Sequence, residues 1–600
     1  MTRHATAMAR IRAPELAGRG WVGAPEDTTL ALMRGRFVLL DFWTFCCVNC
    51  LHVLDELRPL EQRWHDVLTV VGVHSPKFAH EAEPGAVEAA VARYGVSHPV
   101  LDDADMTTWQ AYAARAWPTL VLVDPEGFIV ARYAGEGHAH AIDAVLADLV
   151  PKAEKASTLR REGGLPAPPT STSDGLAYPS GLLALTDGRL LVADTAHHQL
   201  VVLEPDAETV AARLGSGARG LVDGTASTAA FNEPQGMCLL PTAVAADVGY
   251  DVVVADTVNH ALRGLRLGDL TVRTVAGTGR LWSPLDPTAL SSPWDVAWWG
   301  DWVWIAMAGI HQLWTFDPRG GRAQPVAGTR TEGLRDGPLA EACFAQPSGL
   351  AACGSRLWVA DAETSALRWV EDGRVHTAVG TGLFDFGFAD GDADAARLQH
   401  PLGVATLTDA AVLVADTYNG ALRRYDPATG LLTTLADGLT EPAQVVVLDE
   451  VALVLESGAH RVVAVGLDAR TTAPESSART ERAPVPIAPG AVDLVVGFVP
   501  PPGQHLDERY GAATRLRVTA TPAALLRSGE GASTDLVRRL EVDPSVGDGV
   551  LHVTASAASC DGDSGEGAAC HLHQQDWGIP VVVRPDAERR LDLDLGALDT

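Results

Sequence analysis

The chain has 600 residues, of which 47% are hydrophobic and 20% are charged. This length exceeds what one hydrophobic core organises and predicts two to four domains, while the composition excludes a wholly disordered chain. A formal net charge of −30 opposes binding to phosphate backbones and anionic bilayers, so we expect no nucleic-acid and no membrane partner. No apolar run approaches the ~18 residues of a membrane helix, and residues 1–20 lack the apolar segment of a signal peptide. These features predict a soluble, cytoplasmic protein.

Residues 1–150 alternate between apolar strands and amphipathic helices, which predicts an α/β domain. The expected strands are 37–42, 68–73, 120–123 and 128–133, and the expected helices are 51–64, 84–94, 105–115 and 139–150. Residues 151–175 are rich in Pro, Ser and Thr, so we expect a semi-stiff linker there.

Three of the eight cysteines lie where the first strand passes into the first helix. Cys47 and Cys50 form a CxxC motif, and Cys46 precedes it directly. Backbone N–H groups and the dipole at a helix N-terminus stabilise a thiolate, so this position lowers the pKa of the first cysteine. The second cysteine, one helical turn later, is close enough to close a disulfide. A CxxC pair equally supplies half of a zinc site. The residues that could complete such a site are Cys560, Cys570, His571 and His573.

The surroundings of the motif resemble the thioredoxin family. The run Leu40-Asp41-Phe42-Trp43-Thr44-Phe45-Cys46-Cys47-Val48-Asn49-Cys50 matches its active-site strand and turn, and Trp117-Pro118-Thr119-Leu120 matches its cis-proline segment. The long connection over 103–116 is similar to the TlpA-type branch. Two separated motifs in the correct order favour a redox site over metal, so we expect no metal and no cofactor.

The resemblance implies a role for each matching residue. Cys47 would attack a substrate disulfide, Cys50 would resolve the mixed disulfide, and Asp41 would accept the proton of Cys50. Pro118 would shape the surface on which a substrate lies. The expected substrate-surface residues beside it are Trp43, Trp117 and Thr119.

The sequence departs from the family at two places near the cysteines. Cys46 replaces the usual Trp, and Val48-Asn49 replaces the usual proline-containing dipeptide. The intervening dipeptide tunes the reduction potential, so the family's potential does not carry over. Cys46 is a candidate accessory redox residue, with packing as the alternative role. Cys560 and Cys570 are candidates for a reversible disulfide or a relay.

Residues 176–470 repeat themselves, which predicts a six-bladed β-propeller. An apolar strand ends in Ala-Asp-Thr or a close variant, and a Gly-x-x-Asp-Gly element lies 11 positions before a proline, counted from its Asp. The strand ends are Asp194, Asp256, Met307, Asp361, Asp416 and Glu456, and the second element carries Asp223, Asp336 and Asp390. The blade aspartates could bind calcium or substrate, but a repeated Asp at a strand end more often caps a turn, and we expect that role. These units resemble NHL repeats.

Residues 471–490 are predicted to be a second linker and 491–600 a small antiparallel β-sandwich with an Asp/Gly-rich loop between Cys560 and Cys570. The order of parts resembles a family in which a thioredoxin-like domain precedes an NHL-repeat propeller and a C-terminal β domain. The resemblance implies a thiol–disulfide oxidoreductase, acting as a reductase on a protein disulfide or thiol substrate, with the propeller presenting a substrate or partner. The alternative is an interaction scaffold whose thioredoxin-like domain is mainly structural. A hydrolase site in the propeller mouth lacks a nucleophile–base pair in the sequence.

Overall fold

The structure, a computed structural model, describes the chain except for residues 1–10, 162–164, 167, 169–174, 284–285, 384, 449, 469–475, 480–483, 502, 507–511, 562–569 and 596–600. The chain forms two compact units. The first comprises Met1–Lys77, Glu81–Thr170 and Glu481–Thr600, and the second comprises Phe78–His80 and Ser171–Thr480. Within the described part of the chain, no helix combines the length and the apolar character needed to cross a membrane.

The first unit begins with a six-stranded sheet in the order β1-β4-β3-β2-β5-β6. Its strands are β1 (Gly20–Val22), β2 (Phe37–Trp43), β3 (Leu68–His74), β4 (Val100–Asp102), β5 (Thr119–Val123) and β6 (Ile129–Ala134). The helices are α1 (Val48–Trp64), α2 (Ala86–Tyr94), α3 (Thr107–Ala111) and α4 (Ala139–Lys155). Strand β2 is parallel to β3 and antiparallel to β5, and α1 and α4 share one apolar core with the sheet. The α/β domain expected from the alternating pattern is confirmed.

Two helices differ from the expectation. Helix α3 covers Thr107–Ala111 only, because Met106 and Ala113 adopt left-handed backbone conformations (φ 54° and 49°) that a helix cannot continue through. Helix α4 extends to Lys155 and contains Pro151, so the first residues of the predicted linker are helical.

The same unit ends in a β-sandwich, in which two sheets bury one apolar core. One sheet has the order β33-β41-β40-β36-β38, with β35 also paired to β40, and the other has the order β37-β39-β34-β42. The strands are β33 (Val485–Ile487), β34 (Gly490–Gly497), β35 (Gln504–Leu506), β36 (Thr514–Thr521), β37 (Leu526–Ser528), β38 (Gly531–Ser533), β39 (Val537–Val542), β40 (Asp548–Asp561), β41 (Cys570–Val583) and β42 (Arg590–Asp594). The predicted purely antiparallel arrangement is wrong, because β33 pairs β41 and β34 pairs β42 in parallel.

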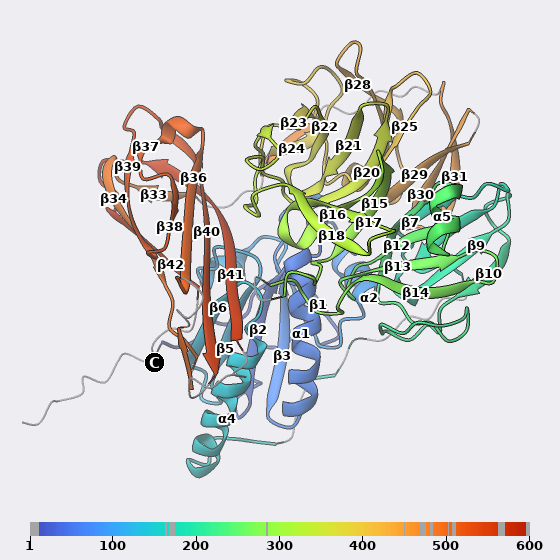
Figure 1. Cartoon of the computed structure of the whole chain (residues 1–600). Coiled ribbons are helices and arrows are strands. Elements are labelled where there is room, and N and C mark those ends of the chain that lie inside the picture. The colour runs from blue at the N-terminus through green and yellow to red at the C-terminus, as the bar shows by residue number, and fades with distance from the viewer. Residues whose placement is uncertain are drawn as a thin grey trace, which may run out of the picture. The chain divides into compact units, whose positions relative to one another are not determined.

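The second unit is a closed ring of six small antiparallel sheets (Figure 1). The innermost strand of each sheet packs against that of the next, and β29 returns to β7. The blades are formed by β7 (Gly181–Ala184) to β10 (Val210–Leu214), β11 (Pro234–Leu239) to β14 (Thr271–Gly277), β15 (Pro293–Trp299) to β18 (Arg322–Ala327), β20 (Pro347–Cys353) to β23 (Arg374–Val379), β25 (Gly403–Thr406) to β28 (Leu431–Ala436) and β29 (Pro442–Leu448) to β31 (Arg461–Gly466). Strand β24 (Asp385–Phe388) pairs β32 (Ser476–Arg479), which lies inside the predicted second linker.

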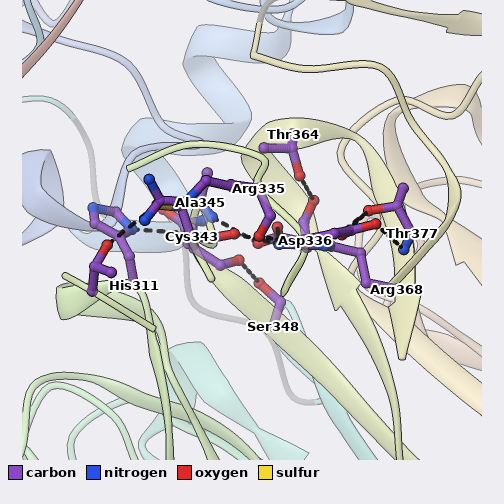
Figure 2. A network of polar contacts seen from close by, with 12 residues as sticks. His311, Arg335, Asp336, Cys343, Ala345, Ser348, Thr364, Arg368 and Thr377 are labelled. Atoms are coloured by element: carbon purple, nitrogen blue, oxygen red, sulfur yellow. Dashed lines mark hydrogen bonds and ion pairs between the residues drawn. The ribbon is translucent and has the colours of Figure 1, made fainter. Parts of the chain in front are cut away.

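One buried arginine joins the two repeated motifs within a blade. In blade four, Arg368 donates to Asp361 at the strand end (3.0 Å). It also donates to Asp336 of the Gly-x-x-Asp-Gly element (3.0 Å), and Figure 2 shows these two side chains together. The Asp336 carboxylate also accepts the backbone N–H of Thr377 (2.9 Å), and the Arg368 guanidinium lies 4.6 Å from the centre of the Phe344 ring. The same arrangement recurs in blade two with Arg263, Asp256 and Asp223, and in blade five with Arg423, Asp416 and Asp390.

All six strand-end residues accept a hydrogen bond from the backbone N–H of the preceding loop, including the two that differ from Asp. The Sδ atom of Met307 accepts the N–H of Ser291 (3.2 Å), and Glu456 accepts that of Thr440 (2.7 Å). The equivalent donors to Asp194, Asp256, Asp361 and Asp416 are Ala177, Asn232, Ala345 and Gln399. A common structural role for this position explains why the repeat is recognisable in the sequence.

The innermost strands carry a second departure from the repeat. Asp295 of blade three and Gln444 of blade six replace the glycine that follows the blade's entry proline by two positions, as in Gly236. Blades three apart in a ring of six lie opposite each other, and the side chain of Gln444 hydrogen-bonds Asp295. This pair therefore spans the middle of the ring.

Candidate functional site

The CxxC motif lies at the junction of β2 and α1. Cys47 holds the N-cap position of α1, with an extended backbone (φ −90°, ψ 111°), and its carbonyl accepts the first helical N–H, that of Leu51 (3.2 Å). The first turn of α1 contains no acidic residue, so nothing in that turn opposes a thiolate at Cys47. The predicted strand–turn–helix setting of the motif is confirmed.

The three clustered cysteines form no disulfide and differ in exposure. Cys47 is 8% exposed, whereas Cys50 has no exposed surface and Cys46 has almost none. Burial and a hydrogen bond with the side chain of Cys47 raise the pKa of Cys50 well above its usual value. Cys50 therefore holds its proton more tightly than an ordinary thiol does.

Asp41 lies in the middle of the site without a partner. Its side chain is completely buried in β2, and neither carboxyl oxygen has a hydrogen-bond partner among the described residues. Burial raises the pKa of Asp41 well above its usual range, and the negative charges of Glu61, Cys47 and Glu56 raise it further. A carboxylate of raised pKa is a stronger base, so this group is suited to accept a proton from a thiol.

A second buried carboxylate, Glu81, positions the turn before Cys47. Its Oε1 atom accepts hydrogen bonds from the Thr44 hydroxyl (2.5 Å) and the Cys46 N–H (3.0 Å), while Oε2 accepts the Lys77 N–H (2.8 Å). The Thr44 carbonyl in turn accepts the N–H of Cys47 (3.3 Å). Glu81 was not predicted from the sequence, because a carboxylate in a short 3-10 helix, 35 residues after Cys46, carries no periodic signal.

The proline segment lies at the same end of the sheet as the cysteines. Thr119, the first residue of β5, pairs with Phe42 near the end of β2, so the chain before Thr119 and the chain after Trp43 emerge together. The Trp117–Pro118 peptide bond is cis, as the resemblance implied, and the Trp117 indole N–H donates to the carbonyl of Ser75 (2.9 Å).

The three residues expected to line the substrate surface are buried. Trp43 has no exposed surface and lies edge-on to His74, with ring centres 5.3 Å apart. Thr119 is 1% exposed and Trp117 is 8% exposed. The structure thus places Trp43 in the interior of the domain, where its side chain packs.

The late cysteines are brought together by the backbone but remain a prediction as a redox pair. Cys560 and Cys570 are direct partners in the register of β40 and β41, while their side chains and the loop 562–569 lie outside the described residues. Within the described part of the chain, no group of three or more His, Cys, Asp or Glu side chains could hold a metal ion.

Comparison with known proteins identifies both folds. The thioredoxin-like family model matches residues 35–129. NHL repeat-containing protein 2 of Bos taurus is 34% identical over 469 residues, which cover 70% of this chain and 62% of the relative. The chain has a thioredoxin-like domain and is homologous to NHL repeat-containing protein 2. Protein SUPPRESSOR OF QUENCHING 1, chloroplastic, of Arabidopsis thaliana is 36% identical over 436 residues, 67% of this chain and 40% of the relative. The chain thus spans less than two thirds of the length of either relative.

The thioredoxin-like domain also has a shorter relative with a stated activity. Thiol-disulfide oxidoreductase YkuV of Bacillus subtilis (strain 168) is 26% identical over 115 residues, which cover 19% of this chain and 77% of the relative. The expected fold class, an α/β thioredoxin-like domain with an all-β propeller and a β-sandwich, is confirmed. The family match and this relative support a redox role for the thioredoxin-like domain.

Proposed function

We propose that the protein is a thiol–disulfide oxidoreductase that reduces disulfides through Cys47 and Cys50. The observation that carries the proposal is that three groups with suitable properties lie near the junction of β2 and α1. Cys47 stands at a helix N-terminus, Cys50 lies buried against it with a raised pKa, and Asp41 lies buried with no hydrogen-bond partner in the described part of the chain. A purely structural domain gains nothing from an unpaired buried carboxyl, so this arrangement favours chemistry over the scaffold alternative.

The first step is an exchange between Cys47 and the substrate disulfide. The Cys47 thiolate attacks one substrate sulfur, an S–S bond forms between Cys47 and that sulfur, and the substrate S–S bond breaks. The other substrate sulfur leaves as a thiolate and takes a proton from solvent. The N–H groups at the start of α1 favour the attacking thiolate.

The second step resolves the mixed disulfide. Cys50 gives its proton to Asp41 and attacks the sulfur of Cys47, so a Cys47–Cys50 bond forms while the bond from Cys47 to the substrate breaks. The second substrate sulfur leaves as a thiolate. Two electrons have then passed from the protein to the substrate, and an external dithiol restores the starting state by reducing the Cys47–Cys50 disulfide.

The propeller, in this proposal, holds a protein partner. Its homology to NHL repeat-containing protein 2 supports a role of its own for this part of the chain. Because the blade aspartates are engaged with arginines and backbone N–H groups, they are assigned to structure.

The test is to trap the intermediate of the first step. Cys50→Ser should accumulate a mixed disulfide with a disulfide substrate, Cys47→Ser should form none, and Cys46→Ser should turn over like the wild type. Mass spectrometry under non-reducing conditions measures the adduct. Absence of an adduct on Cys50→Ser, together with no reduction of any disulfide by the wild type in the presence of dithiothreitol, would overturn the proposal.

A further inference from the structure

The longest hairpin of the C-terminal domain extends past the sandwich to which it belongs. Strands β40 and β41 have 14 residues each, and on one face of β41 the residues Trp577, Ile579 and Val581 fill the sandwich core. The same face continues with Gln575 and His573, which are 4% and 1% exposed. They are buried because the hairpin runs alongside the thioredoxin-like domain of the same compact unit (Figure 1).

Gln575 reaches the residue next to the cis-proline. Its side-chain amide donates to the backbone carbonyl of Trp117 (3.3 Å). Trp117 precedes Pro118 directly and lies at the end of the sheet from which the Cys47 turn emerges. One main-chain acceptor at the same end of the sheet as Cys47 is thus already hydrogen-bonded by the C-terminal domain.

Further contacts fix this arrangement around Gln575. The Arg115 guanidinium donates to the backbone carbonyl of Asp592 (2.6 Å), and the Nδ1 atoms of His138 and His573 lie 3.2 Å apart. Ala116 and Ala134 of the thioredoxin-like domain belong to the same apolar cluster as the sandwich core. An interface that combines a shared core with buried polar contacts is packed as part of one unit rather than as a loose tether.

We propose that the C-terminal β domain, through Gln575 on β41, forms one wall of the surface on which the substrate of Cys47 lies. The wall excludes disulfides that belong to folded proteins and admits low-molecular-weight disulfides. An extended protein segment beside Pro118 would need the Trp117 carbonyl or the space that Gln575 fills, whereas a small disulfide needs only the sulfur of Cys47. This inference rests on the proposed oxidoreductase function and adds the substrate class.

The experiment compares two probes with dithiothreitol as reductant in the full chain: hydroxyethyl disulfide as the small substrate and insulin as the folded one. The wild type should reduce hydroxyethyl disulfide much faster than insulin. Gln575→Ala should raise the insulin rate by about tenfold, the size expected for removing a steric obstruction of a few atoms, with the hydroxyethyl disulfide rate unchanged. Gln575→Met, which keeps the bulk, should retain the wild-type ratio. Arg515→Ala, at an exposed position of the same sheet, is the matched control.

The outcomes separate this inference from the function on which it rests. If the wild type reduces both probes equally well, or if Gln575→Ala keeps its native melting temperature and the wild-type rate ratio, the wall does not exist. If the wild type reduces neither probe, the oxidoreductase function fails instead.

Discussion

Buried carboxylates occur in both compact units, and their surroundings differ. In the propeller, Asp361 is fully buried, but both of its carboxylate oxygens accept hydrogen bonds, one from Arg368 and one from the backbone N–H of Ala345. In the thioredoxin-like domain, Asp41 is equally buried and has no hydrogen-bond partner among the described residues. Burial is the largest cause of the raised pKa at both positions, yet the pKa of Asp361 reaches only about 6 because Arg368 offsets the loss of solvent.

This difference in hydrogen-bond partners distinguishes a carboxylate that stabilises the fold from one that is available for proton transfer. A buried ion pair with satisfied hydrogen bonds holds the chain in one arrangement, and its loss is costly mainly because the remaining charge is left alone. A buried carboxyl without a partner contributes no such constraint and stays ready to exchange a proton. Four substitutions test this distinction, in order of decreasing effect.

The largest effect is expected for Arg368→Ala. Asp361 would keep its burial and lose its counter-charge, so the propeller should lose about 3–5 kcal/mol of unfolding free energy. Urea denaturation followed by tryptophan fluorescence measures the loss. Arg424→Ala is the control, because Arg424 pairs with the exposed Asp409 and should change little. Equal stability of the two variants would show that the buried pair is not a structural element.

Asp41→Asn should leave the fold intact and slow the second redox step. Without the proton acceptor, decay of the mixed disulfide should slow by about 10²-fold. Since the pKa of Asp41 is raised, its carboxylate form appears only as the pH rises, so the wild-type rate should climb with pH and the variant should lack that component. Stopped-flow measurement of the decay rate of the mixed disulfide in both proteins, as a function of pH, tests this prediction. Identical pH profiles would show that Asp41 takes no part in the second step.

Glu81→Gln should have an intermediate effect on the thioredoxin-like domain. The side-chain NH₂ of Gln would point at a hydrogen-bond donor from which the carboxylate now accepts. A buried donor left without an acceptor lowers the unfolding free energy by about 1–3 kcal/mol. The attack of Cys47 should slow as well, because Thr44 and Cys46 lose their fixed positions. Thermal unfolding and the rate of mixed-disulfide formation measure the two effects. Glu83→Gln, at an exposed position two residues later, should match the wild type in both.

The smallest effect concerns Asp295, whose burial raises its pKa to about 7. Because the folded state binds this proton more tightly than the unfolded state, the stability it contributes is complete below about pH 4 and is lost as the pH rises through about 7. Asp256 and Asp361, with pKa values of about 6, act in the same direction. Asp295→Asn should therefore reduce, without abolishing, the fall in melting temperature between pH 5 and pH 8. A pH dependence identical to that of the wild type would contradict the assignment.

Local features of the sequence predicted the fold and the centre of the site well. The Cys47–Cys50 turn lies between a buried strand and an amphipathic helix, both of which have clear periodicity. The repeated motifs also indicated six blades, including the two in which Met307 and Glu456 replace Asp. These predictions succeeded because each depends on residues that are close together in the chain.

Contacts between distant segments could not be predicted in the same way. In three blades an arginine links two motifs that are separate in the sequence: Arg263, Arg368 and Arg423. Neither motif indicates which residue makes this link. Glu81 bonds a turn far from it in sequence, and the parallel pairing of β34 with β42 joins strands that alternation alone cannot match. Such pairings are decided by packing of the whole chain rather than by local pattern.

The ring of blades closes without a shared strand. Among the described strands, those of the first and last sheets form separate ladders, and the two sheets meet through Leu182, Leu190 and Val192 against Leu455. The imidazole of His460 and the carbonyl of Leu176 add one polar contact at 3.0 Å. At the other five junctions the chain also passes directly from one blade to the next, whereas blades one and six are joined by noncovalent contacts alone, so the ring opens most readily at this junction. Backbone amide hydrogens at that junction should therefore exchange with solvent earlier than those in the other blades. Although a closed ring has no ends, its unfolding would then begin at a defined pair of blades.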